Sequence, residues 1–168
     1  MDREAALADF DAARFEWESA FAKVPDEALG HLKPGDDYAL GGLLVHVNWV
    51  LTHYKRVLEG IIKVRPGPLG PQDPAGEAEA AGQQAKAGLE AAQRAKTLGE
   101  MGRLHAAVLT AVKRLPEGDW LRKVAVIYGE GQDPYPTSPE DVIGWLRDHY
   151  REHVEQSADL VTDWRATR

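Results

Sequence analysis

Cysteine is absent from this chain of 168 residues. Its absence excludes disulfide bonds, thiolate metal ligands and a cysteine nucleophile. Any soft metal ion bound by the chain would have to rely on imidazole and oxygen ligands. Any sulfur that takes part in chemistry would have to come from a second molecule.

Positive charge and long apolar runs are also scarce. The chain has 20 Lys and Arg against 27 Asp and Glu, a formal net charge of -7, and no basic patch with interleaved aromatic residues. This balance argues against a nucleic-acid-binding surface, because phosphate binding depends on clustered Lys and Arg. No segment approaches the roughly 18 apolar residues of a membrane span, and the N-terminal residues are acidic and amphipathic. We therefore expect a cytoplasmic protein without nucleic-acid or membrane partners.

Apolar residues recur at helical spacing in four segments of this Ala- and Leu-rich chain. The segments cover residues 5–21, about 36–64, 75–115 and 138–164, with Asp36 or Asp37 as the cap of the second. Spacings of three and four predict amphipathic helices that bury one face. The length is enough for one core. We expect a single all-α domain over residues 1–168, a four-helix bundle with a long irregular connection before the last helix.

The connections between these segments carry their own signals. Residues 65–74 are rich in Pro and Gly and predict a loop between helices. Residues 116–136 are the least helical part, and the β-branched run at 121–128 predicts an extended segment. A connection of this length with aromatic residues, here Trp120, Tyr128 and Tyr135, often covers a pocket mouth. The first half of segment 75–115 is weakly apolar, which leaves open a separate helix before Gly88 or Gly99.

The last helix has a clear start and an unusual inward face. Ser138 is a capping residue, and Pro139 suits the first helical position. Further along, His149 and His153 occupy positions on the apolar stripe where a bundle helix usually has leucines. At a separation of four residues the two rings lie about 6 Å apart along the axis. That spacing suits two ligands of one ion.

A third histidine, His46, lies inside the apolar stripe of the second helix, close after the paired glycines Gly41 and Gly42. These glycines cost helix propensity, and close backbone packing is the expected reason for them. Bundles build metal sites from side chains on facing helices. Three neutral imidazoles would suit zinc, nickel, iron or copper and would leave a coordination position open. The alternative is that all three are hydrogen-bonded histidines of the bundle core.

The other polar candidates have plainer interpretations. We interpret His31 as a surface loop residue, His53 as a buried or rim polar residue about 10 Å along the helix from His46, and His105 as a satisfied core or interface histidine. Asp148 and Glu152 flank the histidine pair. We interpret both as solvated helix carboxylates, with a role as partner of a ligand or as catalytic base as the minority alternative, Glu152 being the candidate base.

The runs GDDYALGGLLVHVNWV and WLRDHYREHVEQ resemble the two signature regions of the DinB/YfiT-like metalloenzyme superfamily. In that family a histidine of the second helix and an HxxxH motif of the last helix hold a divalent metal. The resemblance places the metal ligands at His46, His149 and His153. Where the family often has Trp followed by Ser or Thr before the second helix, this chain has Tyr38 and Ala39.

The resemblance also implies a function. It implies transfer of low-molecular-weight thiols to electrophiles, thiol-dependent isomerisation or hydrolytic detoxification, with zinc, nickel or iron as the metal and a small molecule as substrate. We therefore expect a metal-dependent thiol transferase or hydrolase with a stress or detoxification role, and a homodimer. The alternative is a non-catalytic, metal- or ligand-binding dimeric stress protein.

Overall fold

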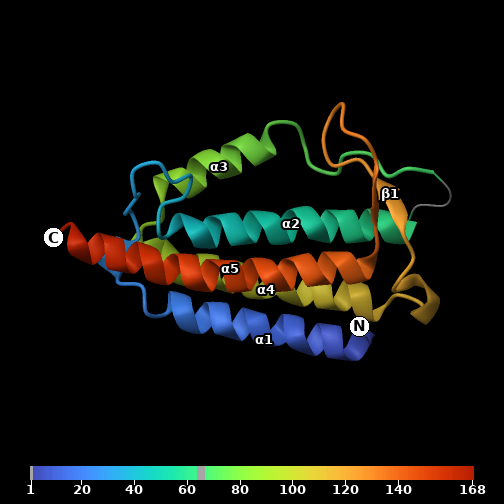
Figure 1. Cartoon of the computed structure of the whole chain (residues 1–168), viewed down its shortest axis with the longest axis horizontal. Coiled ribbons are helices and arrows are strands. Elements are labelled where there is room, and N and C mark those ends of the chain that lie inside the picture. The colour runs from blue at the N-terminus through green and yellow to red at the C-terminus, as the bar shows by residue number, and fades with distance from the viewer. Residues whose placement is uncertain (1, 64–66) are drawn as a thin grey trace.

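The computed structural model describes residues 2–63 and 67–168 (Figure 1). Within these ranges the chain forms five α-helices and one two-stranded sheet. Their bounds are α1 Arg3–Phe21, α2 Gly42–Lys63, α3 Glu77–Ala87, α4 Arg94–Lys113, β1 Val124–Val126, β2 Tyr135–Thr137 and α5 Pro139–Ala166. The all-α class predicted from the apolar spacing is confirmed.

Four long helices form the bundle, and the short helix α3 lies outside it against α2 (Figure 1). Helix α1 packs on α5, and α2 packs on both α4 and α5. The inward face of α1 carries the fully buried rings of Phe10, Trp17 and Phe21. Burying such aromatic side chains is the main stabilising term for packed helices. The core therefore fixes α5 between α1 and α2.

The predicted third helix divides in two, so the expectation of one helix over residues 75–115 is wrong. Helix α3 ends at Ala87. The next residue, Gly88, has a φ of 90°, a backbone conformation that residues with a side chain rarely adopt. A Cβ at Gly88 would lie 2.8 Å from the carbonyl oxygen of Leu29. The close approach of the loop around Leu29 therefore requires glycine, and the alternative of a separate helix before Gly88 is the one observed.

The second helix starts later than predicted. Neither Asp36 nor Asp37 caps it, because residues 36–41 run as an irregular segment before α2 begins at Gly42. Within that segment the Leu40 N–H donates to the His31 carbonyl at 2.8 Å. A Cβ at Gly42 would lie 1.6 Å from the Ala85 carbonyl oxygen, which confirms the close-packing interpretation of the glycine pair. The predicted end of this helix at Val64 and the first residues of the following linker lie outside the described residues.

The connection before α5 folds back on itself as a short hairpin. Strand β1 pairs antiparallel with β2, and Val126 lies opposite Tyr135. Leu69 of the linker adds a parallel bridge to Val126. The extended segment predicted at 121–128 is confirmed only over its central three residues. The hairpin leads into Ser138, whose side chain and backbone exchange hydrogen bonds with Asp141 as a capping box at the start of α5.

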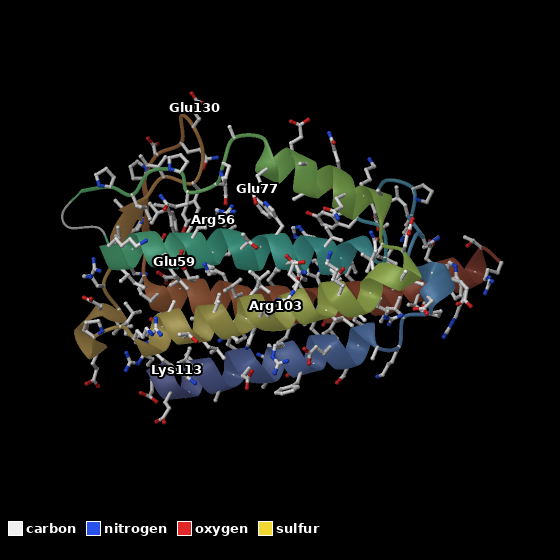
Figure 2. All side chains as sticks on the ribbon, turned by 180° about the vertical axis from the view of Figure 1, so that it is seen from behind. Arg56, Glu59, Glu77, Arg103, Lys113 and Glu130 are labelled. Atoms are coloured by element: carbon white, nitrogen blue, oxygen red, sulfur yellow. The ribbon has the colours of Figure 1, made fainter. Side chains whose placement is uncertain are left out.

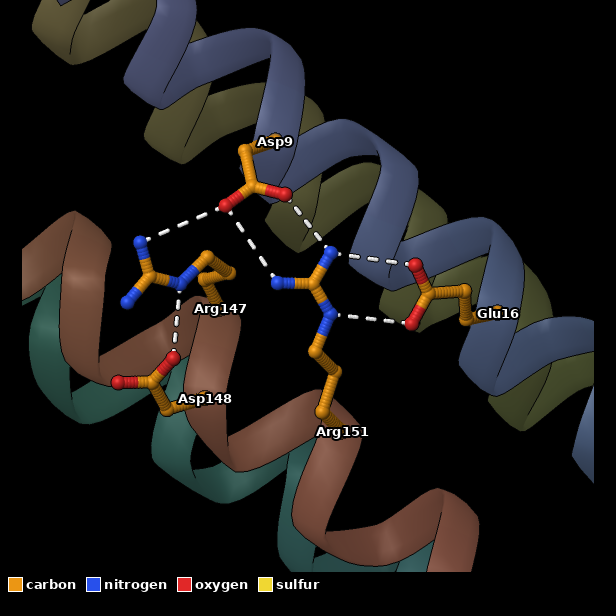
Figure 3. Close-up of polar contacts among 5 residues, drawn as sticks. All are labelled: Asp9, Glu16, Arg147, Asp148 and Arg151. Carbon is orange, nitrogen blue, oxygen red and sulfur yellow. Dashed lines mark hydrogen bonds and ion pairs between the residues drawn. The ribbon is translucent and has the colours of Figure 1, made fainter.

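Charged side chains hold the outer elements in place. Arg56 of α2 donates to Glu77 of α3 at 2.8 and 3.1 Å, and both residues are labelled in Figure 2. Arg56 also donates to Asp73 of the linker at 3.0 Å. On the other side of the bundle Arg151 of α5 donates to Asp9 and Glu16 of α1, at 2.7 Å for the shortest contact (Figure 3). Paired donors of this kind fix orientation as well as distance.

None of the helices in the described ranges is long and apolar enough to span a membrane.

Candidate metal centre

Three histidines from two helices converge at the contact between α2 and α5. The ring centroid of His46 lies 4.9 Å from that of His149 and 5.3 Å from that of His153. The two α5 rings are 4.3 Å apart, and their Nε2 atoms are separated by 3.1 Å. One nitrogen of each ring can be chosen so that all three lie within 4.8 Å of one another. The structure thus brings together the three residues predicted as ligands.

This spacing fits a small divalent ion. Zinc binds imidazole nitrogens at about 2.0–2.1 Å in a tetrahedral arrangement, so two ligand nitrogens are separated by about 3.3 Å. The His149 and His153 Nε2 atoms already approach that separation. At this separation either nitrogen could donate to the other, depending on the tautomers of the two rings. The three residues therefore have the number, type and spacing of donors that could hold zinc or a similar ion.

Burial keeps the three imidazoles neutral. It lowers the pKa of His46 to about 4, with His153 adding to the shift. Burial together with the two neighbouring rings lowers the pKa of His149 to about 3. The pKa of His153 is also lowered by burial, partly offset by a hydrogen bond to Gln156. A metal ligand must be deprotonated, so all three rings are ready to bind near pH 7 without releasing protons.

Two residues orient the rings, and neither was predicted in that role. The Nδ1 of His153 lies 2.8 Å from Gln156 Oε1, one turn along α5. If Nδ1–H donates to this oxygen, the Nε2 lone pair points toward His149. Tyr38 stacks on His46 with a centroid distance of 4.2 Å and an interplanar angle of 21°. Tyr38 is one of the two residues at which the sequence departs from the pattern it resembles, and its ring forms one wall of the cluster.

The two flanking carboxylates have different surroundings. Asp148 accepts a hydrogen bond from Arg147 at 2.7 Å, which fits its interpretation as a solvated carboxylate (Figure 3). Glu152 is 79% exposed, and its Oε2 lies 3.9 Å from His149 Nδ1, beyond hydrogen-bond distance. Glu152 is therefore close enough to influence His149 but does not hold its ring.

The other three histidines lie elsewhere, each beside a carboxylate. His53 contacts Asp73 at 2.5 Å and is half-buried, as expected of a rim polar residue. His105 is 2% exposed and lies between Asp11 at 3.1 Å and the Tyr150 hydroxyl at 3.2 Å, which agrees with its interpretation as a satisfied core histidine. His31 lies in a loop as expected, but it is not a free surface residue, because it is half-buried and contacts Asp163 of α5 at 2.8 Å.

One side of the histidine cluster opens to a pocket. A hollow of about 240 Å³ is lined by His149 together with Val50, Tyr54, Trp145, Asp148 and Glu152. Small-molecule sites are concave and largely apolar, with a few polar groups in their walls. An ion held by the three histidines would have room beside it for a further ligand.

Comparisons with known proteins agree with this architecture. The family model described as the DinB superfamily matches residues 9–157. The crystal structure of a mycothiol-dependent maleylpyruvate isomerase superposes with a TM-score of 0.69 at 13% sequence identity. The match covers 92% of this chain and 60% of the isomerase chain. No curated protein matches the chain.

The similarity to the solved isomerase shows a shared fold, since the sequence identity is too low to carry more. The family model is stronger, because it spans most of the chain, including all three converging histidines. From this match and the helical bundle it accompanies, we conclude that the chain belongs to the DinB superfamily.

Proposed function

We propose that the chain is a divalent-metal-dependent enzyme that transfers a low-molecular-weight thiol, or water, to a small electrophilic molecule. The observation that carries this proposal is the set of three neutral histidines that face one another beside a pocket. The absence of cysteine agrees with it, because the reacting sulfur would then belong to a cosubstrate. The structural neighbour is a mycothiol-dependent isomerase, and its dependence on mycothiol supports a thiol cosubstrate of that kind.

The proposed roles of the site residues are metal binding, orientation of a ligand ring and exclusion of solvent. His46, His149 and His153 would hold the metal, and Gln156 would keep the His153 ring in its ligating orientation. A bound divalent metal acts as a Lewis acid and lowers the pKa of a thiol or water beside it. Tyr38 and the buried face of the cluster restrict solvent on one side, so that a cosubstrate would reach the site from the pocket side.

Proton transfer requires an acceptor near the reacting thiol or water. After a thiol or water loses its proton, its sulfur or oxygen forms a bond to the electrophilic carbon. The bond from that carbon to the leaving atom breaks, and its electron pair goes to the leaving atom. Of the two carboxylates lining the pocket, Asp148 is engaged by Arg147. Glu152 is therefore the candidate acceptor for the proton. Its side chain is 79% exposed, so the proton can pass on to water.

The proposal can be tested with a panel of thiols and one electrophile. Zinc-, nickel- and iron-loaded protein would each be incubated with monochlorobimane and with mycothiol, glutathione, cysteine or no thiol, and the products would be identified by mass spectrometry. We expect a thiol adduct, or a hydrolysis product without thiol, at a rate that falls to background in His149→Ala and is kept in His53→Ala. Rates at background for every metal and thiol would contradict the proposal and favour a non-catalytic binding protein.

A further inference from the structure

A second hollow continues from the histidine pocket toward the hairpin. It has a volume of about 480 Å³ and is lined by Tyr54, Tyr128, Gln132, Asp133, Tyr135 and Trp145. Tyr54 and Trp145 also line the pocket beside His149. We call the two hollows together the aromatic cleft. Its combined size falls within the roughly 300–1,000 Å³ typical of small-molecule sites.

Four aromatic rings from three parts of the chain form the walls. Trp145 of α5 lies 5.7 Å from Tyr54 of α2, 6.5 Å from Tyr128 and 6.2 Å from Tyr135, measured between ring centroids. Tyr135 is 56% exposed and Trp145 is half-buried. Large apolar side chains that remain accessible around one hollow are unusual in a surface without a ligand. The geometry provides ring faces that an apolar body can contact.

The charged groups of the aromatic cleft are all acidic. Asp133, Asp148 and Glu152 line it, and neither hollow has a Lys or Arg among its described lining residues. Asp148 is neutralised by Arg147. Asp133 has no hydrogen bond or ion pair to a side chain in the described ranges, and Glu152 lies beside the neutral His149 ring at 3.9 Å without a hydrogen bond. Two carboxylates at the rim therefore lack a cation.

We infer that the aromatic cleft binds the electrophilic substrate and selects an organic cation with an aromatic-sized apolar body over an organic acid. In the metal-free protein a cation gains from ring faces and from the two carboxylates, whereas an anion would lose hydration there without gaining a Lys or Arg partner among the described lining residues. That the bound molecule is the substrate rests on the proposed function, since the cleft reaches the proposed reacting site only at His149. The inference does not depend on which metal is bound.

Three probes that share a benzyl group isolate the effect of charge. Benzyltrimethylammonium, benzyl alcohol and phenylacetate would be titrated by calorimetry into metal-free and zinc-loaded protein at low salt. In the metal-free protein we expect the cation to bind roughly tenfold more tightly than phenylacetate, with the alcohol between them. The difference should shrink as salt is raised, because the carboxylates are at the surface.

Matched variants locate the site. Asp133→Asn combined with Glu152→Gln should reduce the preference for the cation to about twofold, as expected when exposed charges are removed. The control Glu155→Gln with Asp159→Asn changes the net charge equally on an exposed part of α5 and should leave the preference unchanged. Trp145→Leu should weaken all three probes several-fold, whereas Trp164→Leu, which removes another half-buried ring of α5, should not.

The outcomes separate this inference from the proposed function. Phenylacetate binding as tightly as the cation to metal-free protein, or no probe binding while the protein holds metal and forms thiol adducts, would overturn the inference and leave the proposed function standing. A cation preference that falls to about twofold in the Asp133 and Glu152 variant but persists in the control supports it. The same preference in a protein that binds no metal would support the cation site and contradict the metal-dependent function.

Discussion

The six histidines of the chain form two groups that differ in their partners. His31, His53 and His105 each contact a carboxylate, from Asp163, Asp73 and Asp11. His46 and His153 have no hydrogen bond or ion pair to a carboxylate within the described part of the chain, and Glu152 remains 3.9 Å from His149.

Burial alone does not separate the two groups. Burial, with the charge of Arg14 adding to it, lowers the pKa of His105 to about 4, although Asp11 opposes the shift. Burial lowers the pKa of His46 to about 4 as well. Both residues lie on apolar stripes of bundle helices. The difference is that both ring nitrogens of His105 have partners on other helices, whereas one nitrogen of each of the other three rings faces the cluster. A cation between them would satisfy those nitrogens.

The largest effect is expected on metal affinity. His153→Ala removes a proposed ligand that is 4% exposed and hydrogen-bonded to Gln156. We expect zinc affinity to fall by more than the roughly 100-fold that loss of an outer-sphere partner costs. Competition with a chromophoric chelator measures it. His31→Ala is the control, and an unchanged affinity in His153→Ala would move His153 into the group of structural histidines.

Removing His105 should affect the fold instead. His105→Ala opens a cavity among Phe10, Asp11 and Tyr150 and leaves the Tyr150 hydroxyl without this partner. The free energy of unfolding should fall by about 2–4 kcal/mol. Zinc affinity of the folded protein should not change. Denaturant unfolding and chelator competition on the same sample report both values, and a loss of zinc with unchanged stability would break the distinction between the two groups.

Substitution of Gln156 should reduce zinc affinity less than His153→Ala and more than His105→Ala. Gln156→Leu keeps the volume near His153 but removes the oxygen that orients its ring. A loss of zinc affinity of about 10–100-fold is expected, as for other partners of ligating histidines. Gln156→Glu, which keeps an acceptor at the same place, should restore most of it. Equal affinities in wild type and Gln156→Leu would show that packing alone orients His153.

The contribution of His105 to stability should also depend on pH. Because the folded-state pKa of His105 is about 4 and its ordinary value is 6.5, the unfolded chain binds more protons between these pH values. The stability that neutral His105 provides is complete above pH 6.5 and is lost as the pH falls toward about 4. The advantage of wild type over His105→Ala should therefore shrink by about 2–3 kcal/mol over this range, since one pKa unit corresponds to about 1.4 kcal/mol. Unfolding curves of metal-free protein at pH 7, 5.5 and 4.5 would measure it, and a constant difference would contradict it.

The smallest effect on metal affinity is expected at Glu152. Its carboxylate is 79% exposed and does not hydrogen-bond His149. Glu152→Gln should change zinc affinity by less than about threefold, since exposed charge pairs contribute little. A reduction in the rate of thiol transfer without loss of zinc would support its role as proton acceptor. A large loss of zinc would place Glu152 among the ligands.

Local signals in the sequence predicted much of the fold. Ser138 and Pro139 marked the start of α5 correctly, because capping is decided by neighbouring residues. The convergence of His46 with His149 and His153 followed from their positions on inward helix faces. The break at Gly88 and the late start of α2 were harder to predict. Both depend on the loop near Leu29, whose approach to Gly88 and Gly41 is a long-range contact.

The same limit applies to the partners of the histidines. Gln156 could have been found from the sequence, because it lies three residues after His153 on the same face. Asp163 beside His31 is 132 residues away in the chain, and no local pattern indicates it. The hairpin residues Tyr128 and Tyr135 were expected near a pocket mouth and do line one, whereas Trp120 lines a different hollow. The predicted homodimer stays a prediction.

The most direct measurement is the metal content of untagged protein prepared without chelators, determined by elemental mass spectrometry. Wild type would be compared with His149→Ala and with His53→Ala, a half-buried histidine that has a carboxylate partner. The account predicts nearly one equivalent of a divalent metal in wild type and His53→Ala, and almost none in His149→Ala. Metal-free wild type, still without bound metal after reconstitution with zinc, nickel and iron, would contradict it.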